Sequence, residues 1–496
     1  MNDFVHSLPS IIDHIVQSIP LFKPEIALIG AFLLSVLATL FLDKVWKHSS
    51  YAISLGGLLA SFLYLCGQLD NSVAGFFDML RIDNFSVYAR MLIVFALLMV
   101  CIFVQQHFKE KPDRKRLGEV YGTLLTAGIG LHLLTITSNW LMAFIAIETV
   151  SISSYILVGY FSENKKQSEA AMKYVLFGST SAAVMLYGLS LVYGFTGNLD
   201  FVSMQHIQGL AAAPTVICTI AILFVFTGIG FKLGFVPFHL WTPDVYEGAP
   251  TPITAFLSTV PKIGAIILFS RLTQAWLPTL FYFSEVTFFF LVVVAIVTML
   301  VGNLIALRQL NIKRLMAYSS IGHTGFLLMA IMVLSTDNQE ILLFYLAAYT
   351  LMTLAAFAFI DSIESATGIV DLPAYAGLGK KFPLLFTCFT FAGISLVGLP
   401  PTAGFIGKLL VFTSVFEVYQ TYRDVAHLLL LIVGALTSVI SLFYYFKIPL
   451  FAFLRKSNEE PMYKIGFSLV LVLGVVMSVL LVVLGLFPGL LLGFLR

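Results

Sequence analysis

The chain has 496 residues, of which 59% are hydrophobic and only 11% are charged. Soluble globular chains carry about 25% charged residues, so this composition predicts a membrane protein that crosses the bilayer many times. The formal net charge of +2 gives no indication of nucleic-acid binding. The four cysteines are widely separated in or beside apolar runs, which fits neither a zinc site, an iron–sulfur cluster nor a disulfide framework.

About 14 segments hold the roughly 20 apolar residues that a membrane-spanning helix needs. The N-terminus lacks the pattern of a cleaved signal peptide, so we expect the first span to direct insertion. The two segments at 217–240 and 386–416 are irregular. In chain order the predicted spans are 26–42, 51–68, 85–105, 120–137, 140–160, 170–194, 217–240, 252–275, 283–306, 314–334, 340–360, 386–416, 427–446 and 465–493.

Basic residues predict the orientation of these spans. Loops after odd-numbered spans, with the adjoining helix ends, hold 19 Lys and Arg, whereas loops after even-numbered spans hold only Arg81, Arg271 and Arg423. Since loops rich in Lys and Arg stay in the cytoplasm, we expect both termini on the opposite, periplasmic side. The basic stretch 109–116 then serves as an orientation signal, and Arg90, near one end of the third span, is expected to snorkel.

Three lysines and one glutamate remain deep inside apolar segments: Lys232, Lys262, Lys408 and Glu148, with His323 at a similar depth. Each charge at mid-membrane costs about 3 kcal/mol. Four of them cost about 12 kcal/mol, as much as the whole stability of a typical protein. They must therefore face the bundle interior, pair with one another or line water, and such groups indicate an ion or proton pathway.

The chemistry of this set favours protons over metal ions. A cation site needs several oxygen ligands, but the buried set is mainly lysine. Burial and a like-charged neighbour lower the pKa of a lysine, while a nearby carboxylate raises it, so a lysine can become a switchable proton carrier. A histidine between lysines can pass protons on near neutral pH. Taken singly, each lysine is also compatible with a neutral or snorkelling side chain, and His323 with a hydrogen-bonded core histidine.

Prolines interrupt two of the charged segments. Pro237 has no N–H, so the carbonyl four residues earlier loses its helical partner and a break opens beside Lys232. A second interruption, at Pro400 and Pro401, precedes Lys408 by about two helical turns. Broken helices at membrane depth are tolerated only where protein or a water-filled cavity satisfies the freed backbone groups.

Paired interruptions also predict an internal repeat. The interval from Lys232 to Lys408 equals the interval from Glu148 to His323 to within a single position. We expect an all-α integral membrane protein with two inverted five-helix repeats (spans 4–8 and 9–13) and broken helices at spans 7 and 12. The single polytopic domain, 1–496, would comprise peripheral spans 1–3 (1–115), a first repeat (116–275), a second repeat (280–450), and a C-terminal loop with the last span (451–496).

Three stretches carry a resemblance to a known family: GFKLGFVPFHLWTPDVYEGAPTPITAFLSTVPK at 230–262, NIKRLMAYSSIGHTGF at 311–326 and LPPTAGFIGKLLVF at 399–412. Over essentially its whole length the chain resembles subunit N of respiratory NADH–quinone oxidoreductase, complex I (subunit 2 in organelles). The motif PFHLWTPDVYEGAPTP is similar to the corresponding sequence of subunit N, whereas the sister subunits L and M differ at this position. Lys408 also fits subunit N, because subunit M is expected to carry glutamate.

The resemblance implies one antiporter-like proton channel in the membrane arm. It makes Glu148 the glutamate of span 5, Lys232 the lysine of broken span 7, Lys262 the connecting lysine of span 8, His323 the central histidine and Lys408 the terminal lysine of broken span 12. Lys173 and His239 are expected to support this relay. The resemblance also implies a bacterial inner (plasma) membrane location, subunits M, K and J as partners, and no cofactor in this chain, with flavin, iron–sulfur clusters and quinone in other subunits.

Two other functions are considered. The first is a cation/proton antiporter subunit of the Mrp type, which would exchange sodium for protons without a dehydrogenase; the wording at 237–252 argues against it. The second is a structural membrane-arm subunit with an inactive channel, which the complete set of ionisable residues argues against.

Overall fold

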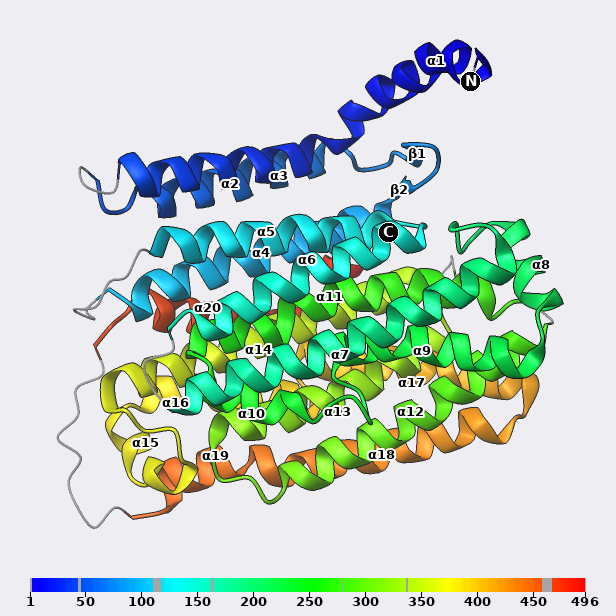
Figure 1. The fold of residues 1–496 in the computed structure, drawn as a ribbon. Coiled ribbons are helices and arrows are strands. Elements are labelled where there is room, and N and C mark those ends of the chain that lie inside the picture. The colour runs from blue at the N-terminus through cyan, green and yellow to red at the C-terminus, as the bar shows by residue number, and fades with distance from the viewer. Residues whose placement is uncertain are drawn as a thin grey trace.

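In the computed structural model the chain forms a bundle of long helices that run side by side, with the N-terminal helix extending beyond the bundle (Figure 1). The structure describes residues 2–42, 46–109, 117–161, 165–279, 281–335, 338–456 and 466–495. Helices α11, α13 and α14 are almost wholly buried and form the centre of the bundle. Long apolar side chains cover the outside, as expected of a surface in contact with lipid.

The elements of the first half are α1 (Asn2–Ser18), the 3₁₀ turn η1 (Ile19–Phe22), α2 (Lys23–Phe41), α3 (Ser49–Cys66), the antiparallel strands β1 (Val73–Gly75) and β2 (Leu80–Ile82), α4 (Asn84–His107), α5 (Leu117–Ile136), α6 (Trp140–Gly159), α7 (Lys165–Thr196), α8 (Met204–Ala212), α9 (Thr215–Leu233), α10 (Trp241–Gly248) and α11 (Thr251–Trp276). Those of the second half are α12 (Tyr282–Ala306), α13 (Ile312–Met332), α14 (Gln339–Thr367), the 3₁₀ turn η3 (Leu372–Tyr375), α15 (Leu378–Lys381), α16 (Pro383–Val397), α17 (Ala403–Tyr422), α18 (Val425–Tyr445), α19 (Lys447–Pro449), the π turn η4 (Leu450–Leu454), α20 (Leu469–Leu486) and α21 (Gly489–Leu495).

The predicted all-α, multispanning architecture is confirmed. The described residues contain 13 helical segments long and apolar enough to cross a membrane, and they coincide with 13 of the predicted spans. The remaining predicted span, 386–416, is divided between α16 and α17. Features outside these spans were not predicted, among them helix α1, the short helices α8 and α10, and the hairpin of β1 and β2, whose segments are too short or too polar to resemble a span.

Both irregular spans are broken in the same way. Helix α9 ends where Gly234 takes a left-handed conformation (φ 66°), and α16 ends where Gly398 does (φ 86°). The N–H of each glycine bonds back into its own helix, which is the glycine cap that terminates many helices. A cis peptide bond to proline follows in each break. The predicted breaks at spans 7 and 12 are therefore present, with glycine as well as proline responsible.

The spacing of the breaks differs from the spacing of the lysines. The interval from Gly234 to Gly398 is shorter than the interval from Lys232 to Lys408, by about three helical turns. Lys232 precedes its break as part of α9, but Lys408 follows its break as part of α17. The two lysines thus occupy different positions relative to the two breaks, and the interval between the lysines does not describe the interruptions themselves.

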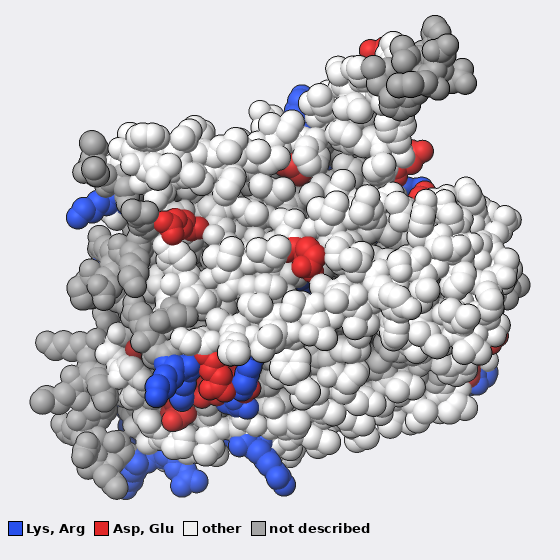
Figure 2. Space-filling model, in the orientation of Figure 1, with Lys and Arg blue, Asp and Glu red and all other residues white. Residues whose placement is uncertain are grey.

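Lysine and arginine side chains gather mainly at one end of the bundle. Figure 2 shows most of the Lys and Arg atoms at the left of the view, beside the loops drawn in grey, while the middle of the face is nearly free of them. Lys44, residues 110–116 and Lys464, which were used to predict the orientation, lie outside the described residues. The sidedness of the termini therefore stays a prediction.

The expectation that Arg90 snorkels is wrong. Its side chain is fully buried in α4, where it forms an ion pair of 3.0 Å with Glu25 at the start of α2. Glu25 Oε1 also lies 3.0 Å from His132 Nδ1 on α5, and Arg90 donates a second hydrogen bond to Gln68 (2.9 Å). This cluster joins the peripheral helices to the first helix of the main bundle. The arginine turns inward because it has a buried carboxylate to pair with.

Removal of one partner from this cluster should be strongly destabilising. We expect Arg90→Met to lower stability by about 3–5 kcal/mol, because it leaves the Glu25 carboxylate buried without its cation. The double variant Arg90→Met, Glu25→Leu should recover much of the loss. Thermal unfolding of the complete membrane complex measures both effects. Arg81→Met, which alters a partly exposed arginine of β2, is the control, and equal midpoints for R90M and R81M would contradict the prediction.

Candidate functional site: a row of buried ionisable side chains

The row begins with Glu148 on α6 and Lys232 on α9. Lys232 is 3% exposed, and its Nζ has no hydrogen-bond partner among the described residues. The charge that stabilises its ammonium form is that of Glu148, although these two described residues form no direct ion pair. Glu148 is only partly buried. Lys232 is therefore compensated at a distance by one carboxylate.

Lys262, on α11, is held by hydroxyl groups instead. Its Nζ donates to the carbonyl oxygen and to Oγ of Ser320 (both 2.7 Å) and to Oγ1 of Thr324 (2.8 Å). Both partners lie on α13. Ser320 Oγ is also 2.8 Å from the hydroxyl of Tyr349 on α14. All three ammonium protons of Lys262 thus have acceptors, so this buried cation is fully satisfied.

Thr324 connects Lys262 to the break beside Lys232. Its hydroxyl accepts from Lys262 and lies 3.1 Å from two carbonyl oxygens that share its proton, that of Leu233 and that of Ser320 on its own helix. This carbonyl is the one that was predicted to lose its helical partner. A side chain from another helix satisfies it, as membrane interiors require. A single hydroxyl therefore lies between the ammonium group of Lys262 and the end of the helix that carries Lys232.

The far end of the row contains His323 on α13 and Lys408 on α17. Lys408 is buried, and its Nζ donates to the carbonyl oxygens of Val397 (2.7 Å) and Leu396 (3.3 Å), the last residues of α16 before its break. The ammonium group also lies 4.6 Å from the centre of the Phe326 ring, a cation–π contact. Lys408 therefore occupies the negative C-terminal end of a broken helix.

His323 lies between the two lysines. Its Nδ1 is 2.9 Å from the hydroxyl of Tyr345, and the charges of Lys262 and Lys408 both act on its ring. The structure thus brings together all five residues predicted to form the relay, from α6, α9, α11, α13 and α17. Their arrangement as a row with hydroxyls and carbonyls between them is chemically suited to handing on protons.

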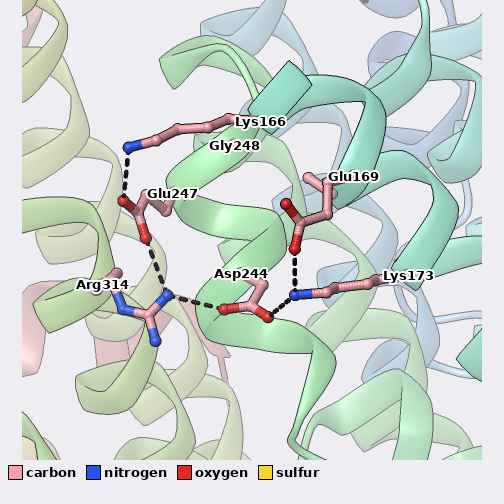
Figure 3. Close-up of a pocket in the computed structure, with 8 residues that line it drawn as sticks. Lys166, Glu169, Lys173, Asp244, Glu247, Gly248 and Arg314 are labelled. Carbon is pink, nitrogen blue, oxygen red and sulfur yellow. Dashed lines mark hydrogen bonds and ion pairs between the residues drawn. The ribbon is translucent and has the colours of Figure 1, made fainter. Parts of the chain in front are cut away.

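Lys173 does not join this row. It lies on the surface near the start of α7, where its Nζ pairs with Asp244 (2.6 Å) and Glu169 (2.7 Å). Asp244, on α10, also pairs with Arg314 of α13 (2.8 Å), so one carboxylate links two long helices to the half-helix after the first break. Figure 3 shows the alternating charges around a cavity of about 180 Å³, lined by Lys166, Glu169, Ala170, Lys173, Asp244, Glu247, Gly248 and Arg314.

The protonation state of Asp244 follows from these partners. Partial burial favours a higher pKa, but the hydrogen bonds from Lys173 and Arg314 outweigh it and hold the pKa of Asp244 below its ordinary value. The carboxylate therefore stays ionised at neutral pH and keeps α10 tied to α7 and α13.

His239 lies in the turn between α9 and α10. It is 9% exposed, and its Nδ1 has no hydrogen-bond partner in the part of the chain that the structure describes. Among the residues that the structure describes, no hydrogen bond joins its side chain to the five residues of the row. It shares the broken span with Lys232, but it is not hydrogen-bonded to the relay.

The sequence interpretation missed the hydroxyl groups that link the row, above all Thr324 and Ser320. These residues stand at 320 and 324 in SSIGHTGF, one helical turn apart and on either side of His323. That spacing places two hydroxyls on one helix face, which was an available signal. Which lysine they would meet depends on how α11 and α13 pack, and periodicity within one helix does not carry that information.

The fold and the row define a class of membrane protein. Residues 137–441 match the family described as NADH:quinone oxidoreductase/Mrp antiporter, TM. The fold also resembles a chain in the structure of the Mrp complex from Dietzia sp. DQ12-45-1b (TM-score 0.78, 20% identity, 97% of this chain and 96% of that one). At this identity the likeness concerns the fold alone.

Relatives of higher sequence identity show to which branch of this family the chain belongs. The chain is 40% identical to NADH-quinone oxidoreductase subunit N 2 of Chloroherpeton thalassium, over 88% of this chain and 86% of that protein. It is 34% identical to subunit N of Bacillus anthracis, over 94% and 93%. A chain of respiratory complex I from Thermus thermophilus is 32% identical with a TM-score of 0.77, over 95% and 99%. The chain belongs to the subunit N family of NADH-quinone oxidoreductases.

The bridging role of Thr324 can be tested without a change in shape. Thr324→Val removes one acceptor from Lys262 and the donor to the Leu233 carbonyl, so we expect a loss of about 1–3 kcal/mol in stability. Thr287→Val is the control, because the buried Thr287 hydroxyl bonds only to its own helix, at Phe283. Thermal unfolding of the assembled complex compares them. A midpoint for T324V no lower than that of T287V would contradict the bridging role.

Proposed function

We propose that this chain translocates protons in the membrane arm of an NADH–quinone oxidoreductase, and that Glu148, Lys232, Lys262, His323 and Lys408 carry the protons along the row. The observation that supports this most is the way the lysines are held. Each has a different kind of partner: a distant carboxylate for Lys232, three hydroxyl and carbonyl acceptors for Lys262, and the carbonyls of a broken helix for Lys408.

Electron transfer to quinone in other subunits would alter the charge at one end of the row. When the Glu148 charge changes, the ammonium form of Lys232 gains or loses its only compensating charge among the described residues. Its proton then passes towards Lys262 and on to His323 and Lys408. A lysine that holds a proton is positively charged and repels a further proton, so the transfer proceeds one step at a time along the row.

The position of Glu148 also supports the proposal that a neighbouring subunit packs against this chain. It lies on the outward-facing stripe of α6 that contains Leu141, Ile145, Ile152 and Ile156, each about half exposed. A carboxylate facing lipid at mid-membrane costs about 3 kcal/mol, so this stripe is better covered by protein. We propose that another antiporter-like or small membrane subunit, of the kind named M, K or J, packs here and brings a charge to Glu148.

The remaining parts of the proposal follow from family membership. The chain lies in a bacterial inner membrane with both termini on the periplasmic side, and it contains the two units 116–275 and 280–450 as related repeats. Flavin, iron–sulfur clusters and quinone are held by other subunits, so this chain contributes to the enzyme by moving protons. Lys173 and His239 act outside the row, at the ion-pair cluster and in the break.

Sodium/proton exchange of the Mrp type is the alternative within the same fold. It is less well supported, because the relatives reported above at 32–40% identity belong to NADH-quinone oxidoreductases and complex I. The row also offers three ammonium groups, one imidazole and one carboxylate, and a protonated amine cannot ligate a cation. A purely structural subunit would not need buried lysines that are costly to insert.

Substitution of Lys232 should distinguish proton translocation from a purely structural role. We expect Lys232→Met to reduce proton pumping by at least about tenfold, since the carrier next to Glu148 is removed and acid–base catalysis of this kind contributes about 10²–10⁴-fold. Assembly should survive, because a long apolar side chain replaces an ammonium group that has no hydrogen bond to any described residue. The proton-to-electron ratio of the complete enzyme in sealed vesicles measures the effect.

The matched control is Lys166→Met, which removes an exposed lysine from the surface ion-pair cluster and should leave the ratio unchanged. A normal ratio in the fully assembled K232M enzyme would refute the assignment of Lys232 and favour the structural alternative. Sodium dependence of pumping in the unaltered enzyme would favour the exchanger.

A further inference from the structure

A groove hollows the outer face of the hairpin formed by α2 and α3. It encloses about 470 Å³ in the outermost layer of the bundle, where these two helices lie side by side (Figure 1). The groove exists because side chains are missing along it. A Cβ added to Gly30 or Gly56, one from each helix, would meet nothing within 4 Å. The nearby Leu37 and Leu59 are each at least half exposed, so the face is apolar and opens outward.

The length of the groove matches one leaflet of a bilayer. On α2 its lining runs from Lys23 to Leu34, and on α3 from Ile53 to Tyr64. Each run covers about three helical turns, or about 16 Å along the helix axis. The hydrocarbon core is about 30 Å thick, so the groove reaches about half-way across. A transmembrane helix docked here would need a surface along the full length of the hairpin, whereas a lipid chain needs one leaflet.

One end of the groove has the chemistry of the membrane surface. Lys23 is the first residue of α2, and Tyr64 lies near the last residue of α3, Cys66. Because the helices are antiparallel, both side chains lie at the same end. Within the described residues no carboxylate pairs with Lys23; the nearby Glu25 turns inward to Arg90 and His132. Basic and aromatic residues at a helix end mark the level of the lipid headgroups.

We propose that this groove binds an anionic phospholipid, with one acyl chain between α2 and α3 and the phosphate paired with Lys23. Charge complementarity at one end and an apolar channel of one-leaflet depth together select this occupant. The site is independent of the proton row and of the proposed function. By the predicted orientation, the lipid belongs to the leaflet on the side of the N-terminus.

Two sets of substitutions test the apolar channel and the cationic end of the groove separately. Gly30→Leu with Gly56→Leu fills the channel, and these positions have free space for a side chain. Lys23→Gln keeps the channel and removes the cation. The matched controls are Leu33→Phe, which adds bulk on the exposed face of α2 away from the groove lining, and Lys47→Gln, which removes a lysine at the other end of the hairpin.

The test uses the complete complex, stripped of loosely bound lipid and placed in nanodiscs of equal parts phosphatidylglycerol and phosphatidylcholine. Retained lipids are counted by mass spectrometry after mild detergent extraction, and the groove is imaged by electron cryomicroscopy. We expect density for a lipid tail in the groove and an enrichment of phosphatidylglycerol of about fivefold at this site. K23Q should lose the enrichment but keep the tail, the filled variant should lose both, and L33F and K47Q should change neither.

Retention and headgroup preference that are the same in K23Q, in the filled variant and in the unaltered complex would overturn the proposal. A helix of a neighbouring subunit seated in the groove of the unaltered complex would also overturn it. K23Q does not disturb helix packing. If the filled variant fails to assemble, the headgroup preference measured with K23Q still decides the test.

Discussion

Backbone carbonyls freed inside the membrane are the constraint on which the rest of this structure depends. Each of the two broken helices ends at a glycine cap, and the last carbonyls of each helix have no partner within it. In the absence of bulk water they must be satisfied by side chains. The hydroxyl of Thr324 meets the carbonyl of Leu233, and the ammonium group of Lys408 meets those of Leu396 and Val397. The free carbonyl groups at the breaks thereby provide binding sites for cations in an apolar interior that would otherwise exclude them.

The three buried lysines differ in how completely their charge is compensated, and this difference gives the row a direction. Lys262 and Lys408 have close oxygen acceptors, while Lys232 depends on the more distant charge of Glu148. A change at Glu148 therefore acts first on Lys232. Since Glu148 lies on the outward-facing stripe of α6, we propose that its charge state responds to a neighbouring subunit.

Much of this arrangement was predictable because composition and a few residue types dictate it. Apolar runs indicate the spans, prolines indicate the breaks, and the cost of a buried charge requires Lys232, Lys262 and Lys408 to face inward, whereas the glycine caps that end α9 and α16 were not predicted. Pairing across helices was not predictable. Arg90 stands near a helix end, where a snorkelling arginine is the usual outcome, and its partner Glu25 is 65 residues away in the sequence. The pairing of Lys173 with Asp244 was not predictable either, because the position of α10 after the break depends on how α7 and α13 pack around it.

The most direct test of the central claim is an electron cryomicroscopy map of the assembled complex at a resolution that shows ordered water. The account predicts water molecules that bridge Glu148 to Lys232 and that join Lys232, Lys262, His323 and Lys408 into one hydrogen-bonded line. Dry apolar packing wider than a single water between any two neighbours in this row would contradict it.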